Sequence, residues 1–251
     1  MSIFFRKIRK KFAYKKQFLK YSRYAIGEIV LVVIGILIAL QINNWNEYNK
    51  ERINEKSYLK RLLFDYKENI VEYNELIDIH DKGIKKIEVF LDTIYKNVSS
   101  ADEYAKIIQS SSWEASEIKI SDITFFEISN SGKLDIIQNQ NLREQILKYH
   151  KLVEVSSNHI EEMNKTGLDM FTKIYPHINK YFLYDKNRLY KYTPKDWEYF
   201  NDPTSDLFKQ LEGTSFHYLF KYYFILEYTH TLKEKAQYLI DEIEIELSKN
   251  K

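Results

Sequence analysis

Histidine and carboxylate side chains at helical spacing are the first candidates for chemistry in this sequence. Glu227 and His230 form an E-x-x-H pair, which places two metal ligands on one face of a helix. A dimetal site of the ferritin type needs two such pairs and two further carboxylates, and this is the one pair present. His150 and Glu154 stand four residues apart, a spacing more typical of solvated neighbours on a helix. We therefore expect no metal site.

Other catalytic signatures are missing as well. The chain has no cysteine, which excludes a thiol nucleophile, a disulfide and a thiolate metal site. It also lacks the G-x-S-x-G and G-x-G-x-x-G patterns, and the segment around Gly132 lacks the remaining residues of a phosphate loop. We expect no enzymatic activity and no cofactor, although acid–base pairs assembled from distant helices would leave no spacing signal.

The remaining histidine candidates fit a structural role. Asp78 and Asp81 lie on one helical face around His80, but the sequence identifies no third group beside them. His80 and His177 both fall on apolar stripes, where we expect each to pack at the edge of the core with one hydrogen bond.

Composition bounds the fold that must position these residues. Six glycines and three prolines in 251 residues leave few helix breakers, which predicts an all-α protein. The 21 tyrosines and 15 phenylalanines argue against disorder. The net charge of +2 hides a basic N-terminus, because residues 1–23 contain nine Lys or Arg and no Asp or Glu.

An apolar segment follows this basic arm. Residues 29–40, IVLVVIGILIAL, are too few to span a bilayer, but apolar flanks extend the run to Tyr24–Ile42. Nineteen helical residues measure about 28 Å, close to the hydrocarbon thickness of a membrane. Tyr21, Tyr24 and Trp45 mark the two edges. We predict an uncleaved transmembrane helix at 24–42; the rival, a cleaved signal peptide, lacks a convincing cleavage site after LIALQINN.

The basic arm predicts the orientation of the span. More bases precede the apolar segment than follow it closely, so the N-terminus is expected in the cytoplasm and the C-terminal part outside it. Phe4, Ile8 and Phe12 recur every four residues, the pattern of a helix lying on a membrane surface. Beside a bilayer, the lipid surface is favoured over nucleic acid as its partner. The expected membrane-surface residues are Arg6, Lys7, Arg9, Lys10, Lys11, Lys15 and Lys16.

Small residues within the span leave room for a second helix. Gly35 and Ala39 form a small-xxx-small pair, and Gly27 lies two turns earlier on nearly the same face. Such residues also occur in spans without a partner, so a homo-oligomer or a partner membrane helix stays open. Glu28, near the cytoplasmic edge, is read first as an interfacial carboxylate and second as a contact with that helix.

The rest of the chain predicts a helical bundle at 59–251 above a helical stalk at 43–58. Apolar residues recur with alternating steps of four and three in two stretches, from Leu59 to Val98 and from Leu142 to Tyr181, where Pro176 should end or kink the helix. A third helix is expected from Ser215 to Ser248. Its predicted buried side is formed by Phe216, Phe220, Phe224, Tyr228, Leu232, Ala236, Leu239, Ile243 and Leu247.

Shorter helices are expected between these stripes. One should be capped by Ser99 or Ser100 and another by Ser121, while Thr193-Pro194 is a favourable helix start. We expect an intramolecular bundle; the rival, an intermolecular coiled coil, is disfavoured by Tyr and His at core positions.

Three stretches resemble a known family. FFRKIRKKF, KYSRYAIGEIVLVVIGILIALQINNWNE and ISNSGKLDIIQNQNLREQILKYH are similar to segments of a domain-of-unknown-function family of single-pass membrane proteins from Bacteroidota. Residues 3–48 match closely and residues 118–150 match in pattern. The resemblance implies an inner-membrane anchor with a periplasmic helical domain, and it implies no activity.

Three functions remain in view. A non-enzymatic, membrane-tethered interaction or scaffold protein of the cell envelope agrees best with the anchor, the heptads and the missing catalytic motifs. A periplasmic sensory or signalling accessory, coupled through the transmembrane helix, is the alternative. A hydrolytic or metal-dependent enzyme is the third.

Overall fold

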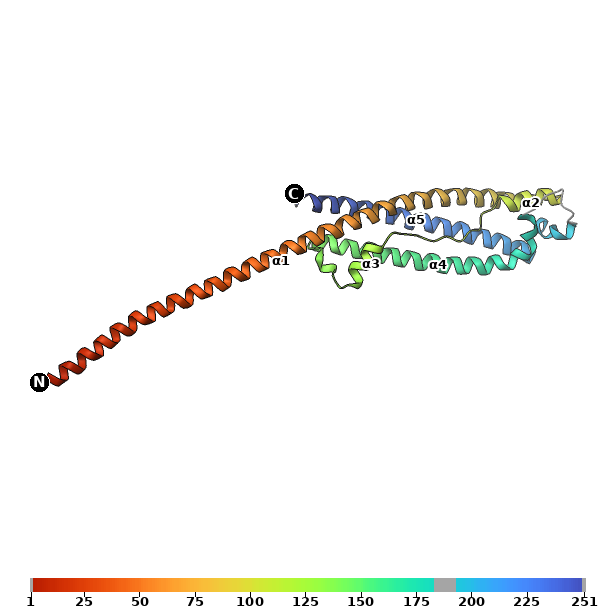
Figure 1. The fold of residues 1–251 in the computed structure, drawn as a ribbon. Coiled ribbons are helices and arrows are strands. Elements are labelled where there is room, and N and C mark those ends of the chain that lie inside the picture. Colours follow the sequence, from red (N-terminus) through yellow and green to blue (C-terminus); the bar gives the residue numbers. More distant parts are fainter. Residues whose placement is uncertain (1, 183–192, 250–251) are drawn as a thin grey trace. The chain divides into compact units, whose positions relative to one another are not determined.

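The described part of the chain is built from helices, which confirms the all-α prediction. The structure, a computed structural model, describes residues 2–182 and 193–249, with side chains from residue 26 onward. Five α-helices are present in these residues: α1 (Ser2–Thr93), α2 (Ala101–Ser110), α3 (Ile123–Asn130), α4 (Gln140–Phe182) and α5 (Asp206–Ser248) (Figure 1). Three short 3₁₀ helices complete them: η1 (Leu134–Ile136), η2 (Pro194–Asp196) and η3 (Glu198–Asn201).

The chain divides into two compact units. The first ends at Lys56 and contains the apolar segment, while the second begins at Ser57 and contains the bundle. Helix α1 contributes to both, because it is assigned without a break from Ser2 to Thr93. Gly83, which could have bent this helix, does not interrupt it.

Three long helices form the core of the second unit. Residues 57–93 of α1 run beside α4 and α5, and α2 and α3 cover part of the bundle (Figure 1). The predicted stripes are largely the buried faces: Tyr66, Tyr73 and Ile87 on α1 are fully enclosed. On α4, Leu142, Ile146 and Ile160 are equally buried. The 4-3 spacing therefore identified the packing faces of these two helices.

Helix α5 begins earlier than predicted and buries a different face. Its N-cap is Ser205, whose side chain accepts from the Phe208 amide, so Gly213 and Ser215 lie inside the helix. Phe216 and Phe220 are more than half exposed, whereas Tyr218, Tyr222 and Ile225 are buried. The predicted stripe is thus wrong at Phe216 and Phe220, holds in part at Phe224 and Tyr228, which are partly buried, and is correct from Leu232 to Ile243.

The second stripe also needs correction near its end. Pro176 does not end α4, which continues to Phe182, and His177 is exposed while Ile178 takes the buried position. A proline in a helix removes one backbone hydrogen bond but does not always stop the helix.

The shorter helices follow their capping residues closely. Ser100 caps α2 by accepting from the Glu103 amide, and Thr193 with Asp196 forms a capping box at η2. The N-cap of α3 is Asp122 instead of Ser121, and it makes no side-chain cap bond. Gly132, after the end of α3, has a φ of 67°, a left-handed conformation in which glycine avoids the Cβ clash.

Close packing of α1 against α5 depends on Gly83. A Cβ at this position would lie 2.8 Å from Cε2 and 3.0 Å from Cδ2 of Tyr222, and this tyrosine is buried with little freedom to move. Gly213, inside α5, offers a matched comparison, because a Cβ added there would have Cε of Met170 as its nearest neighbour, at an ordinary contact distance of 3.7 Å.

Substitution of the two glycines should therefore shift stability in opposite directions. Gly83→Ala gains up to about 1 kcal/mol of helix propensity but incurs an overpacking cost of about 1–3 kcal/mol, so a net loss is expected. Gly213→Ala should gain roughly 0.5–1 kcal/mol. Thermal unfolding of the detergent-solubilised chain, followed by circular dichroism, measures both; an equal rise in Tm for the two variants would contradict the close contact.

Candidate functional site

An extended segment crosses the second unit and marks the site. Residues 111–122, here called the strap, connect α2 to α3 and run along the bundle without helical structure (Figure 1). His80 contacts Ser116 and Asn69 contacts Ser121. These two residues of α1 are about 16 Å apart along the helix, and the two serines are about 16 Å apart in a fully extended chain. The strap is therefore extended and antiparallel to α1.

Two asparagines hold the main chain of the strap. The side chain of Asn164 on α4 accepts from the Ser116 amide at 3.2 Å and donates to the Ser116 carbonyl at 2.6 Å. The side chain of Asn69 on α1 accepts from the Ser121 amide at 2.6 Å and donates to the Ser121 carbonyl at 3.1 Å. A side-chain amide thus satisfies both backbone groups of one residue, as a neighbouring strand would.

Asp65 places the end of the strap and the start of α3. Its carboxylate accepts from the Ser121 hydroxyl at 3.3 Å and from the Thr124 amide at 3.2 Å. Because Asp122 makes no side-chain cap bond, this acid from α1 supplies the N-terminal acceptor that α3 would otherwise lack. Packing of α3 is completed by the contact of Arg61 and Tyr58 with Glu127.

A buried lysine and tyrosine on α5 hold the other part of the strap. Lys221 Nζ donates to the Glu114 carbonyl at 2.7 Å and to Asn164 Oδ1 at 3.1 Å, and the Tyr222 hydroxyl accepts from the Glu114 amide at 3.0 Å. The lysine nitrogen also lies 4.2 Å from the centre of the Tyr218 ring, a cation–π contact. Burial lowers the pKa of Lys221 to about 8, because the charged form has lost its water.

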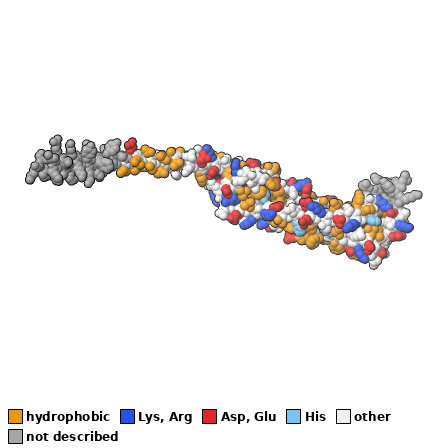
Figure 2. Space-filling view, turned by 90° about the horizontal axis from the view of Figure 1, so that it is seen from below, with side chains coloured by type: hydrophobic (Ala, Val, Ile, Leu, Met, Phe, Trp, Pro, Cys, Tyr) orange, Lys and Arg blue, Asp and Glu red, His pale blue; other side chains and the backbone are white. Residues whose placement is uncertain are grey.

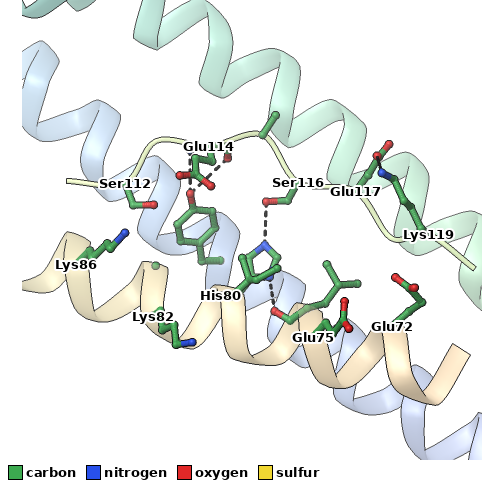
Figure 3. Close-up of a pocket in the computed structure, with 15 residues that line it drawn as sticks. Glu72, Glu75, His80, Lys82, Lys86, Ser112, Glu114, Ser116, Glu117 and Lys119 are labelled. Atoms are coloured by element: carbon green, nitrogen blue, oxygen red, sulfur yellow. Dashed lines mark hydrogen bonds and ion pairs between the residues drawn. The ribbon is translucent and has the colours of Figure 1, made fainter. Parts of the chain in front are cut away.

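A pocket lies between the strap and α1. It has a volume of about 480 Å³, with α1 on one side, the strap on the other and Tyr222 of α5 beside them. Figure 3 shows Lys82 and Lys86 toward the end where Ser112 and Glu114 lie, and Glu72 and Glu75 toward the opposite end. On the α1 wall of the pocket the basic and acidic side chains are therefore separated along the strap, whereas the strap brings Glu114 to the basic end and Lys119 to the acidic end.

His80 lies at the floor of this pocket with both ring nitrogens engaged. Nδ1 donates to the Leu76 carbonyl at 2.7 Å, and Nε2 lies 2.8 Å from the Ser116 hydroxyl. Burial lowers the pKa of His80 and favours the neutral ring, so Nε2 accepts from Ser116. The sequence predicted a partly buried histidine with one bond; the ring is buried and makes two, and it serves to hold the strap.

A second, larger groove lies on the other side of the strap. Its volume is about 870 Å³, and Ile118, Phe125, Phe126 and Leu147 give it a largely apolar wall. His150 of α4 also lines it, stacked on the Phe125 ring at a centroid distance of 3.6 Å. Its Nε2 lies 3.2 Å from the Tyr66 hydroxyl. Burial lowers the pKa of His150 to about 3.

The acid–histidine pairs of the sequence do not assemble into a site. Glu227 and His230 are both exposed on α5. Glu154 pairs with Lys151 instead of acting with His150, and Asp78 pairs with Lys82. Across residues 2–182 and 193–249, no three histidine, aspartate or glutamate side chains gather closely enough to hold a metal ion.

The membrane-related residues are only partly described. The structure does not describe the side chains of the predicted membrane-surface residues, which are Arg6, Lys7, Arg9, Lys10, Lys11, Lys15 and Lys16. Gly27 and Gly35 have open space where a Cβ would stand, and Glu28 and Ala39 are exposed. From Ile26 to Ile42 the large apolar side chains are 46–71% exposed. Figure 2 shows this stretch as a run of hydrophobic side chains. One helix is therefore long and apolar enough to cross a membrane.

The strap and its contacts were not predicted from the sequence. Asn69, Asn164 and Lys221 are polar residues at positions that spacing alone assigns to solvated faces. A signal exists for Lys221, since it lies in an alternative stripe of α5 that includes Tyr218 and Ile225. For the asparagines no spacing pattern distinguishes a residue that binds backbone from one that faces water.

The partly buried ring of His150 predicts a specific loss of stability in acid. Its folded pKa of about 3 lies below the unfolded value of about 6.5, so the unfolded state binds the extra proton between these values. Stability should fall by up to about 1.4 kcal/mol per pH unit as the pH decreases from 6.5 toward 3. In urea unfolding, His150→Phe should flatten this part of the profile.

The exposed His230 provides the control, because His230→Gln should keep the wild-type slope. A wild-type slope in His150→Phe as well would show that the ring is not buried as a neutral group.

Comparison with known proteins finds a similarity to a family of unknown function and indicates no activity. No curated protein and no solved structure matches the chain. Residues 28–150 match the model of DUF6090, a family of unknown function. This match confirms the resemblance to a family of unknown function over the stretch from the apolar segment to the start of α4.

Proposed function

We propose that this chain is a membrane-anchored interaction protein of the cell envelope, held by one transmembrane helix at 24–42. The main support is the apolar run from Ile26 to Ile42, which is exposed and which no described residue covers. An uncovered apolar surface of this length is costly in water and stable in a bilayer. The basic residues of segment 1–23 support an N-terminus in the cytoplasm and a bundle on the far side, the periplasm of a cell with an inner membrane.

A non-enzymatic role is part of the proposal. It is supported by the use of the buried polar groups: His80, Asn164 and Lys221 all bind the strap, and their hydrogen bonds are directed to protein atoms. A bundle with grooves on both sides of the strap and an anchor at one end of the chain suits the capture of a partner at the membrane.

A sensory or signalling accessory is the second candidate. The observation in its favour is that α1, the helix containing the apolar segment, also contributes Glu75, His80 and Lys86 to the wall of the 480 Å³ pocket. A ligand bound there would contact the same helix that crosses the membrane. In this alternative, a signal would pass through α1 to a partner helix in the membrane.

Membrane insertion and orientation should be measurable directly. The full chain is expected to stay in the membrane pellet after alkaline carbonate extraction and to be released by detergent. A C-terminal alkaline phosphatase fusion should be active and a C-terminal β-galactosidase fusion inactive, because the bases of segment 1–23 retain the N-terminus. An N-terminal tag should remain on the mature protein; its loss would indicate a cleaved signal peptide, and phosphatase inactivity would reverse the orientation.

Helix contact in the bilayer should depend on the small residues of the span. Replacing Gly35 and Ala39 with Leu adds bulk where close approach of two helices needs small side chains, and should weaken self-association or pairing with a partner helix. In-membrane cross-linking measures this, with Ile36→Leu and Ile38→Leu as the matched control on the same helix. Unchanged cross-linking in the Gly35→Leu, Ala39→Leu variant would remove the need for a helix partner.

A further inference from the structure

The two edges of the strap face different helices. In an extended chain, the N–H and C=O groups of successive residues point alternately to opposite sides. Both backbone groups of Glu114 and of Ser116 bond to residues of α4 and α5, whereas both groups of Ser121 bond to Asn69 of α1. Even-numbered residues of the strap therefore direct their backbone toward α4 and α5, and odd-numbered residues toward α1.

This alternation leaves a strand edge open beside the pocket. The backbone groups of Ala115, Glu117 and Lys119 face α1, and all three residues line the pocket between the strap and that helix. Within the described residues, none of these amides and carbonyls has a hydrogen-bond partner. The three residues are also exposed, and the pocket that they line lies on the α1 side of the strap. Unpaired groups at every second residue are the pairing pattern of a free β-edge.

The pocket has room for a short extended peptide at this edge. From Ala115 to Lys119 an extended chain measures about 13 Å, and a paired strand lies about 4.8 Å away. The volume of about 480 Å³ falls within the range of sites that bind small molecules or short peptides. His80 and Tyr222 form the floor and are already hydrogen-bonded to the strap, so an incoming chain would not need to break their bonds.

The charges of the α1 wall indicate what such a peptide would carry. Lys82 and Lys86 lie toward the Glu114 end of the strap, and Glu72 and Glu75 toward the Lys119 end (Figure 3). Lys82 already pairs with Asp78, and Lys119 of the strap interacts electrostatically with Glu72. A peptide with an acidic side chain near Lys86 and a basic side chain near Glu75 would complement both ends. Backbone pairing would supply affinity, and these charges would supply specificity and direction.

We propose that the strap edge at Ala115, Glu117 and Lys119 binds an extended segment of a partner protein, about five residues long and carrying both signs of charge, by strand addition. This inference rests on the proposed function as an interaction protein and names the form in which its partner docks. The partner segment pairs with the strap on the α1 side, while Asn164 and Lys221 hold the strap from the α4 and α5 side.

A proline in the strap provides the matched test. Glu117→Pro removes a backbone donor that faces the pocket and bonds to no described residue, and the extended Ser116 before it tolerates proline. Glu117→Ala removes the same side chain and keeps the donor. The probe is a displayed library of random pentapeptides, selected on the detergent-solubilised full chain. Enriched peptides should bind wild type and Glu117→Ala alike, and bind Glu117→Pro at least 10-fold more weakly, with unfolding temperatures unchanged.

An N-methyl scan of an enriched peptide gives a second, independent readout. Because alternate residues of a paired strand face its neighbour, methylation of every second amide should weaken binding about 3- to 10-fold and methylation of the others should not. A library without enrichment, equal binding to Glu117→Pro, or a scan without this period of two would overturn the proposal. If cross-links to a partner in cells persist in Glu117→Pro, docking at the strap is wrong while the proposed interaction function stands.

Discussion

Most of the second unit depends on one requirement: an extended backbone must be held by helices that have no strand to offer. Buried amides and carbonyls without partners are costly, so the bundle replaces the missing strand with side chains. Asn69, Asn164 and Lys221 occupy positions on three different helices and each binds the strap. These polar side chains therefore contribute to the packing of the unit, because they satisfy backbone groups of the strap.

The position of α3 follows from the same requirement. Asp65 and Asn69 lie four residues apart on α1, where they fix the last residues of the strap and the first turn of α3 together. The strap is extended and antiparallel to α1. Once one helix residue binds the strap backbone, the positions of the other strap residues opposite their partners are therefore fixed as well. The pocket beside α1 is a consequence of this arrangement, because the strap is held from α4 and α5 along the stretch where the pocket opens.

The sequence predicted the elements better than the site. The stripes of α1 and α4 alternate in steps of four and three over many turns, so burial on one face was readable directly. In α5 two stripes compete: hydropathy favours the aromatic one through Phe216 and Phe220, whereas the buried one contains Ser215, Lys221 and Thr229. Hydropathy assigns these to the surface, yet Ser215 and Thr229 bond to their own helix backbone and Lys221 to the strap. The site was not readable because its residues come from segments far apart, and a polar residue that binds backbone has the same spacing as one that faces water.

The long sequence separation between the strap and the lysine that binds it has a consequence for protein synthesis. Glu114 precedes Lys221 by 107 residues. At typical elongation rates of about 5–20 residues per second, the ribosome needs roughly 5–20 seconds to reach the lysine after making the strap. During that interval Ile118 and Ile120 are exposed on a nascent strand with unpaired edges, the kind of segment that aggregates. Glu117 and Lys119 alternate with them along the chain, and charged residues in this arrangement keep a newly made strand from pairing with its neighbours on a polysome.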